Sequence, residues 1–84
     1  MSVYIDHARI PYGRMRMCHM IADTLGELFA MVDRIGIKRI HYQARASTPH
    51  FDICLSKRKL AVKCGAIEVT SRELIKIVRC LRET

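Results

Sequence analysis

Alternating apolar and polar positions at the start of the chain predict two β-strands. In residues 2–6, Val3 and Ile5 fall on one face and Tyr4 falls on the other, as is typical of a strand. Residues 14–21 alternate in the same way, with His19 among the residues of one face. The Pro-Tyr-Gly sequence at 11–13 between them indicates a turn.

Apolar residues at helical spacing predict three helices. Thr24 followed by Glu27 forms a capping box, and Gly36 suits the left-handed residue that ends a helix. A second helix is predicted from about residue 55 to 64, and a third follows a capping box at Thr70 and Glu73. The core-facing residues expected are Leu25, Leu28, Phe29, Val32 and Ile35, then Leu60, Ala61 and Cys64, then Leu74, Ile75, Val78 and Leu81.

Two further strands are predicted at residues 37–43 and 66–69, with a loop at 44–49. The resulting order is β-β-α-β-α-β-α, which favours an α/β fold with about four strands in a parallel or mixed sheet and three helices. At 84 residues, the chain is expected to form a single α/β domain over 1–84. A domain this small has little core, so a homo-oligomer would stabilise it.

The formal net charge is +7, from 15 Lys+Arg against 8 Asp+Glu. This excess favours an anionic partner, either a small phosphorylated molecule or nucleic acid, although a merely solvated basic surface would give the same count.

No apolar run approaches the roughly 20 residues that a membrane helix needs. Asp6, His7 and Arg9 interrupt any signal peptide. The four cysteines form no CxxC pair, so we expect free thiols, a cytoplasmic location and no structural zinc.

The richest stretch for chemistry is residues 48–58, where a loop is predicted to become the second helix. It contains His50, Asp52, Lys57 and Arg58. In open α/β sheets, ligands bind beyond the carboxyl ends of the strands, and we expect polar residues from several such ends to converge there. The residues placed at these ends are Asp6, His19, Asp23, Gln43, His50 and Asp52.

Two kinds of chemistry would use such a cluster. The carboxylates and histidines would hold a divalent metal for phosphodiester hydrolysis. Alternatively, His50, Lys57, Arg58 and the helix N-terminus would bind a phosphate, with Arg9 extending the basic surface. Lys57 and Arg58 oppose the helix dipole, which favours a bound anion over a metal. A purely structural role remains open, in which the aspartates cap helices and the histidines are hydrogen-bonded.

Cys54 lies near the expected N-cap of the second helix. Helix N-termini and neighbouring cations lower the pKa of a thiol, so a reactive thiolate is one interpretation of this residue. The other three cysteines are interpreted as small apolar side chains.

Several motifs together resemble a known family. They are Val3-Tyr4-Ile5-Asp6, Cys18-His19-Met20 with Ala22-Asp23, His50-Phe51-Asp52-Ile53, Ser56-Lys57-Arg58, Ala61, Gly65-Ala66 and Glu68-Val69. This combination is similar to a family of short bacterial and phage proteins catalogued as a domain of unknown function (family four-thousand-thirty-one). The resemblance implies no activity. His7 stands where the family commonly has an acid or amide, and Cys54 where it commonly has Thr or Ser. Asp6 at the end of a strand and a later Asp before a helix are also similar to acidic residues of small metal-dependent nuclease domains of the PIN-like type.

The sequence leaves three functions open. The first is a binding module without turnover for a phosphorylated ligand, nucleotide or nucleic acid, through Asp6, Arg9, His19, Gln43, His50, Asp52, Lys57 and Arg58. It would need no metal or other cofactor, and a phage-encoded module of this kind would act against host defence. The second is a metal-dependent nuclease with Asp6, Asp23 and Asp52 as ligands and with His19 or His50 as general base or phosphate-binding residue. The third is a basic protein-interaction or inhibitor module that docks on an acidic partner.

Overall fold

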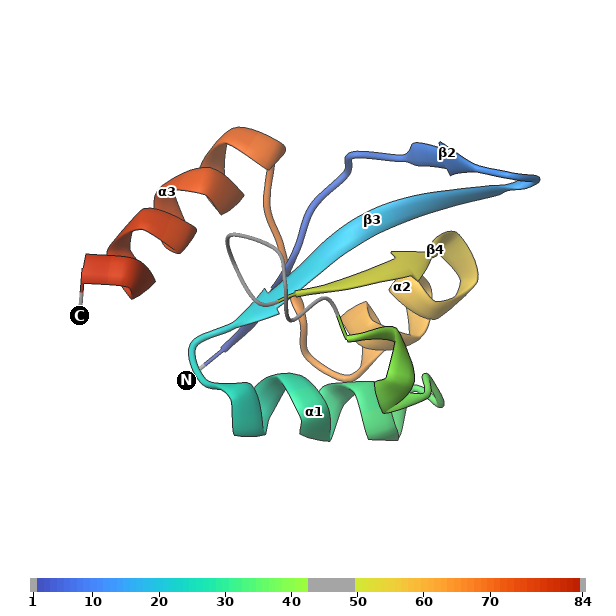
Figure 1. Cartoon of the computed structure of the whole chain (residues 1–84), viewed down its shortest axis with the longest axis horizontal. Coiled ribbons are helices and arrows are strands. Elements are labelled where there is room, and N and C mark those ends of the chain that lie inside the picture. Colours follow the sequence, from blue (N-terminus) through green and yellow to red (C-terminus); the bar gives the residue numbers. More distant parts are fainter. Residues whose placement is uncertain (1, 43–49, 84) are drawn as a thin grey trace.

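The structure is a computed structural model that describes residues 2–42 and 50–83 (Figure 1). Its elements are β1 (Val3–Ile5), β2 (Ile10–Tyr12), β3 (Met15–Ala22), α1 (Leu25–Arg34), the 3-10 helix η1 (Arg39–His41), β4 (Phe51–Cys54), α2 (Leu55–Lys63), β5 (Ile67–Glu68) and α3 (Ser71–Glu83). The predicted α/β class, with three helices and a mixed sheet, is confirmed. Within the described residues, no helix is both long enough and apolar enough to cross a membrane.

The sheet is built around β3. This strand pairs antiparallel with β1, β2 and β4, while β1 pairs parallel with β5. Met20 lies opposite Ile5 on one side and opposite Phe51 on the other, so β4 runs along the edge of β3 that β1 leaves open. The same register places His19 directly opposite Asp52. The central strand β3 therefore holds residues of the N-terminal strand β1 and of β4, which are far apart in the sequence, in fixed positions.

The two faces of the sheet carry separate cores. On one face, Ile5, Met20 and Phe51 are fully buried with Leu28 and Val32 of α1, and α2 covers the same cluster through Ala61. On the other face, a smaller cluster of Ile21, Val69 and Leu74 lies beneath α3. Figure 1 shows α3 on the opposite side of the sheet from α1. Because side chains alternate along a strand, His19 and Asp52 point to the α3 side.

The strand predicted at 37–43 is wrong for residues 37–42, where the chain forms η1. Arg39 holds this segment against α1: its guanidinium donates to both Asp33 carboxylate oxygens, at 3.1 and 2.7 Å, and lies 5.0 Å from the centre of the Phe29 ring. Ile40 is consequently 84% exposed and contributes nothing to the sheet. Gln43 and the predicted loop at 44–49 lie outside the described residues.

Two strands were not predicted. Residues 10–12, interpreted partly as a turn, form β2, and residues 51–54, interpreted as a loop, form β4. The helix predictions hold, with capping boxes at Thr24 and Thr70 and positive φ angles at Gly36 and Gly65. Three residues expected to face the core are instead exposed: Leu25, Leu60 and Ile75.

The first capping box gives a prediction about stability. Thr24 Oγ1 accepts the backbone N–H of Glu27 at 3.2 Å, and its hydroxyl donates to the Glu27 carboxylate at 2.9 Å. Thr24→Ala leaves that N–H without its cap, and we expect it to lower the free energy of unfolding by about 1 kcal/mol. Thr24→Ser keeps the hydroxyl and should lie within about 0.5 kcal/mol of the wild type in urea denaturation. An equal loss in both variants would show that the threonine methyl group, not the cap, matters.

Candidate functional site

Asp6 is the buried anchor of the candidate site. It follows β1 directly, and its side chain is only 1% exposed. One carboxylate oxygen, Oδ1, accepts the backbone N–H groups of His19 at 2.8 Å and Ala8 at 3.2 Å. The other, Oδ2, lies 2.8 Å from His19 Nδ1. These contacts fix the carboxylate in one orientation against β3.

The Asp6–His19 pair shifts the pKa values of both groups. Burial alone would raise the pKa of the Asp6 carboxyl, but hydrogen bonds from the His19 ring and from the His19 and Ala8 N–H groups outweigh it and hold the pKa below its ordinary value. The hydrogen bond to Asp6 raises the pKa of His19, against the opposing effect of desolvation. Because an ionised carboxylate only accepts hydrogen bonds, it holds the proton of a neutral His19 on Nδ1. The lone pair of His19 is therefore on Nε2.

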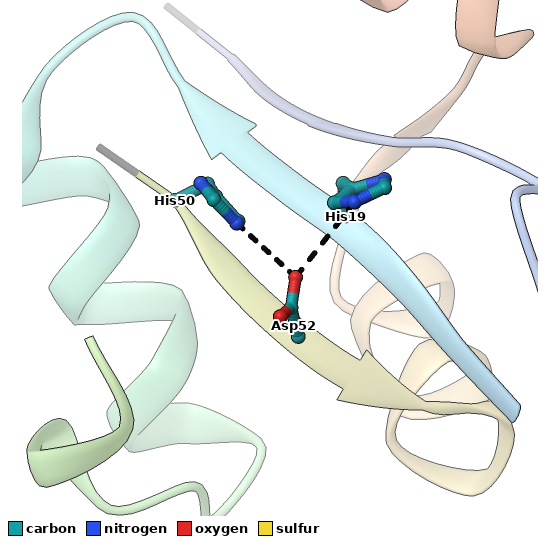
Figure 2. Close-up of side chains that lie close together, drawn as sticks. All are labelled: His19, His50 and Asp52. Carbon is teal, nitrogen blue, oxygen red and sulfur yellow. Dashed lines mark ion pairs between the residues drawn. The ribbon is translucent and has the colours of Figure 1, made fainter. Parts of the chain in front are cut away.

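Asp52 lies at the point toward which two histidines converge (Figure 2). Its Oδ1 is 3.9 Å from His19 Nε2 and 3.2 Å from His50 Nε2. His19 comes from β3, whereas His50 directly precedes β4 and is separated from Asp52 by one residue. Although the side chain of Asp52 is 38% exposed, its Oδ1 atom is buried and accepts no hydrogen bond from the described residues. A buried carboxylate oxygen without a hydrogen bond is costly in the absence of a bound cation.

The three side chains form a group that fits a metal ion. The donor atoms of His19, His50 and Asp52 all lie within 4.8 Å of one another. Two donors on a tetrahedral zinc-sized ion, each at about 2.1 Å, lie about 3.4 Å apart. The 3.2 Å distance from His50 to Asp52 Oδ1 matches this separation, and a small side-chain rotation would shorten the 3.9 Å distance from His19 to it. Asp6 behind His19 supplies the carboxylate–histidine–metal arrangement common in metalloproteins. We call His19, His50 and Asp52 the triad.

The triad lies between two hollows of the surface. One, of about 230 Å³, is largely apolar, is open to solvent and lies between the sheet and α3. Its lining residues are Asp6, His19, Ile21, His50, Ser71, Leu74, Ile75 and Val78. The other, of about 330 Å³, reaches the triad at Asp52 and extends toward β2. We call this second hollow the hairpin groove. The triad is thus accessible from two directions.

The remaining predicted site residues are dispersed. Arg58 donates to the Asp6 carbonyl oxygen at 3.1 Å, contacts His7 Nδ1 at 2.9 Å and pairs with Glu68 at 3.0 Å, so it secures the backbone behind the triad. Lys57 lines the hairpin groove. Arg9 lies in the connection between β1 and β2 and is not part of the triad.

Three predicted positions in the cluster need correction. Asp23 accepts the Ser2 N–H at 2.8 Å beyond the end of β3, four residues from His19, and so lies away from the triad. Asp52 belongs to β4 and not to a loop, and His19 lies within β3 and not at its end. The site consequently occupies a face of the sheet, because these side chains alternate across the strands.

Ser71 was not predicted as a site residue. Its hydroxyl lies 3.5 Å from Asp6 Oδ2, and because the two residues are 65 positions apart, no local sequence signal indicates this contact.

Cys54 is the N-cap residue of α2, as expected, and its side chain makes no capping hydrogen bond. Its sulfur lies 3.2 Å from Ser56 Oγ. Burial would raise the pKa of the thiol, but the Ser56 hydroxyl and the nearby backbone N–H groups at the start of α2 outweigh this and lower it, although none of those N–H groups makes a capping hydrogen bond to the sulfur. The geometry is compatible with a thiolate at the edge of the hairpin groove.

The fold and site together define a small α/β domain in which His19, His50 and Asp52 are close enough to hold a metal ion. Residues 3–81 match the family model described as "Protein of unknown function (DUF4031)", and the chain belongs to this family. The predicted resemblance is thereby confirmed. No curated protein and no solved structure matches the chain.

Proposed function

We propose that this domain is a divalent-metal-dependent phosphodiesterase in which His19, His50 and Asp52 bind the metal ion. The observation that carries the proposal is the convergence of two imidazole Nε2 atoms on the buried Oδ1 of Asp52. The Asp6–His19 hydrogen bond supports it, because it keeps the His19 lone pair directed at the same point.

The donor set limits the choice of metal. Two imidazoles and one carboxylate suit Zn²⁺, Mn²⁺, Fe²⁺ or Co²⁺ better than Mg²⁺, which prefers oxygen ligands and retains several waters. Three protein ligands also leave coordination positions for water and substrate, as is usual in catalytic sites. A metal held here would lower the pKa of a bound water and polarise a phosphoryl oxygen.

Charge supports a phosphodiester as the substrate. The chain carries a formal charge of +7, and Lys57 lies in the groove that reaches Asp52. Asp52 and the Asp6 carboxylate behind His19 together balance the charge of a divalent ion, so a phosphodiester would be held by the open coordination positions of the ion and by Lys57. The predicted PIN-like ligand set of Asp6, Asp23 and Asp52 is replaced in this proposal, because Asp6 accepts hydrogen bonds from His19 and Asp23 lies elsewhere.

A metal-free binding module for a phosphorylated ligand is the second candidate, favoured by Lys57 in the hairpin groove. The carboxylates of Asp6 and Asp52 oppose an anion at the triad itself. A basic protein-interaction module, a phage-encoded role against host defence, a cytoplasmic location and a homo-oligomer all stay predictions.

Isothermal titration of the chelator-treated protein tests the proposal directly. We expect one Zn²⁺ or Mn²⁺ per chain, bound more tightly than Mg²⁺. Hydrolysis of bis(p-nitrophenyl) phosphate, a chromogenic phosphodiester, should require the added metal and cease with EDTA. The metal-free protein serves as the matched control. Absence of metal binding at millimolar concentrations, or hydrolysis that EDTA leaves unchanged, would contradict the proposal.

A further inference from the structure

The hairpin groove extends the candidate site toward the β2–β3 hairpin. Its volume of about 330 Å³ falls within the range of about 300–1,000 Å³ typical of small-ligand pockets. The residues that line it are Tyr12, Met15, Met17, Ile37, His41, Asp52, Ile53, Cys54 and Lys57. Asp52 belongs to both the groove and the triad, so the groove adjoins the proposed metal position at this residue, whereas His19 and His50 line the hollow beside α3.

The wall formed by the hairpin is exposed and rich in polarizable side chains. Tyr12 is 68% exposed and Met15 46% exposed, and the two residues are paired across β2 and β3. From Met15, β3 continues through Met17 to His19 on the same face of the sheet. Met15 and His19 are four residues apart, which is roughly 13 Å along a strand. A ligand of that length would contact Tyr12 and the triad simultaneously.

The charge around the groove suits a polyanion. Lys57 lies on its wall. Arg14 and Arg16 are exposed elsewhere on the same hairpin and do not line the groove. Among the described residues that line the groove, Asp52 alone carries a carboxylate, and in the proposed function that group binds the metal. A hollow that combines an exposed aromatic ring, thioethers and a cation matches the requirements for binding a base together with its phosphate.

We propose that the hairpin groove binds a nucleobase of single-stranded nucleic acid, stacked on Tyr12, and that this places a nearby phosphodiester at the triad. This inference rests on the proposed function for its catalytic part only. A base enters the hollow only if its faces are not already stacked and its edge is not paired. The groove therefore selects single strands over duplexes.

Fluorescence anisotropy in EDTA tests the groove without the metal. We expect a fluorescein-labelled oligothymidylate to bind the wild type, and a labelled duplex of the same length to bind more weakly. Tyr12→Ala should weaken single-strand binding by about 5- to 150-fold, the equivalent of one lost stacking contact of about 1–3 kcal/mol. Tyr12→Phe keeps the ring and should bind as the wild type does.

Ile40→Ala is the matched control, because Ile40 is an exposed apolar residue that does not line the groove. Circular dichroism verifies the fold of each variant. Equal affinity for duplex and single strand, or equal binding by Tyr12→Ala and the wild type, would overturn the groove assignment even if metal-dependent hydrolysis is observed. Tyr12-dependent binding without metal-dependent hydrolysis would instead retain the groove and reject the catalytic proposal.

Discussion

Replacing Asp52 with asparagine is expected to weaken Zn²⁺ or Mn²⁺ binding by at least about 100-fold and to abolish metal-dependent hydrolysis. Loss of an outer partner of a metal site already reduces affinity by about 10–100-fold, and Asp52 is a proposed direct ligand. The substitution removes the anionic oxygen toward which His19 and His50 converge at 3.9 and 3.2 Å. Isothermal titration of the two metals and the chromogenic phosphodiester assay measure both effects.

The stability of the metal-free protein separates a ligand role from a structural one. Asp52 Oδ1 is buried and accepts no hydrogen bond from the described residues, so Asp52→Asn removes a buried charge without breaking such a bond. We expect the free energy of unfolding of the metal-free protein at pH 8 to stay within about 0.5 kcal/mol of the wild type, or to rise. A purely structural ion pair would give the opposite result, a clear loss of stability.

Asp33→Asn provides the matched control for this experiment. Asp33 is also a partly exposed aspartate in an ion pair, with its Oδ2 2.7 Å from Arg39 Nη2. It lies at the end of α1, on the other side of the sheet from the triad, so the substitution should leave metal binding and hydrolysis unchanged. Equal loss of metal binding in Asp33→Asn and Asp52→Asn would show that the ion binds by general charge, and the triad assignment would then be wrong.

Local signals made much of the fold predictable. The capping boxes at Thr24 and Thr70 place hydrogen-bonded side chains at fixed offsets, and Gly36 and Gly65 occupy left-handed positions after helices. The strand expected at 37–43 failed because Arg39 binds Asp33, a contact that alternation alone does not reveal. β4 was not predicted because it has only four residues and α2 follows it directly, without a turn to mark the end of the strand.

The site was predictable as a set of residues but not as an arrangement. Asp6, His19, His50 and Asp52 stood out by residue type, and the structure brings them together. What joins them is strand register, because a shift of one residue in the β3–β4 pairing would move Asp52 away from His19. Register depends on the buried partners Met20 and Phe51, whose packing is a property of the whole core. The contact of Arg58 with the Asp6 carbonyl oxygen also depends on tertiary packing, so it was not predictable from the sequence.

Asp6→Asn tests the residue that orients the site. The introduced amide would keep an oxygen acceptor for the His19 and Ala8 N–H groups, which Asp6 Oδ1 now accepts at 2.8 and 3.2 Å. Its nitrogen would then donate to His19 Nδ1 and place the ring proton on Nε2. A protonated Nε2 does not ligate a metal, so we expect metal affinity to fall by about 10–100-fold although Asp6 is not itself a ligand. Isothermal titration at pH 8 measures the change.

The same substitution has a pH-dependent effect on the metal-free protein, measured by urea denaturation in EDTA. Because the folded-state pKa of Asp6 is lowered, its stabilising effect is present above the ordinary value near 3.9 and is lost as pH falls through the folded-state pKa. Because the pKa of His19 is raised, its effect is complete below about 6.5 and is lost as pH rises through the folded-state pKa. The stabilising effects of Asp6 and His19 are therefore both fully present between roughly pH 4 and 6.5.

We therefore expect Asp6→Asn to lower the free energy of unfolding by about 1–3 kcal/mol in that interval, and by less on either side. His19→Gln is the matched variant, because it removes the ring and its titration while keeping a polar side chain opposite Asp52. In the Asp6→Asn, His19→Gln double variant, the two losses should be non-additive, since both substitutions break the same charge-assisted hydrogen bond at 2.8 Å. Strict additivity across pH 4–8 would mean that Asp6 and His19 act independently, and Asp6 would then not orient the site.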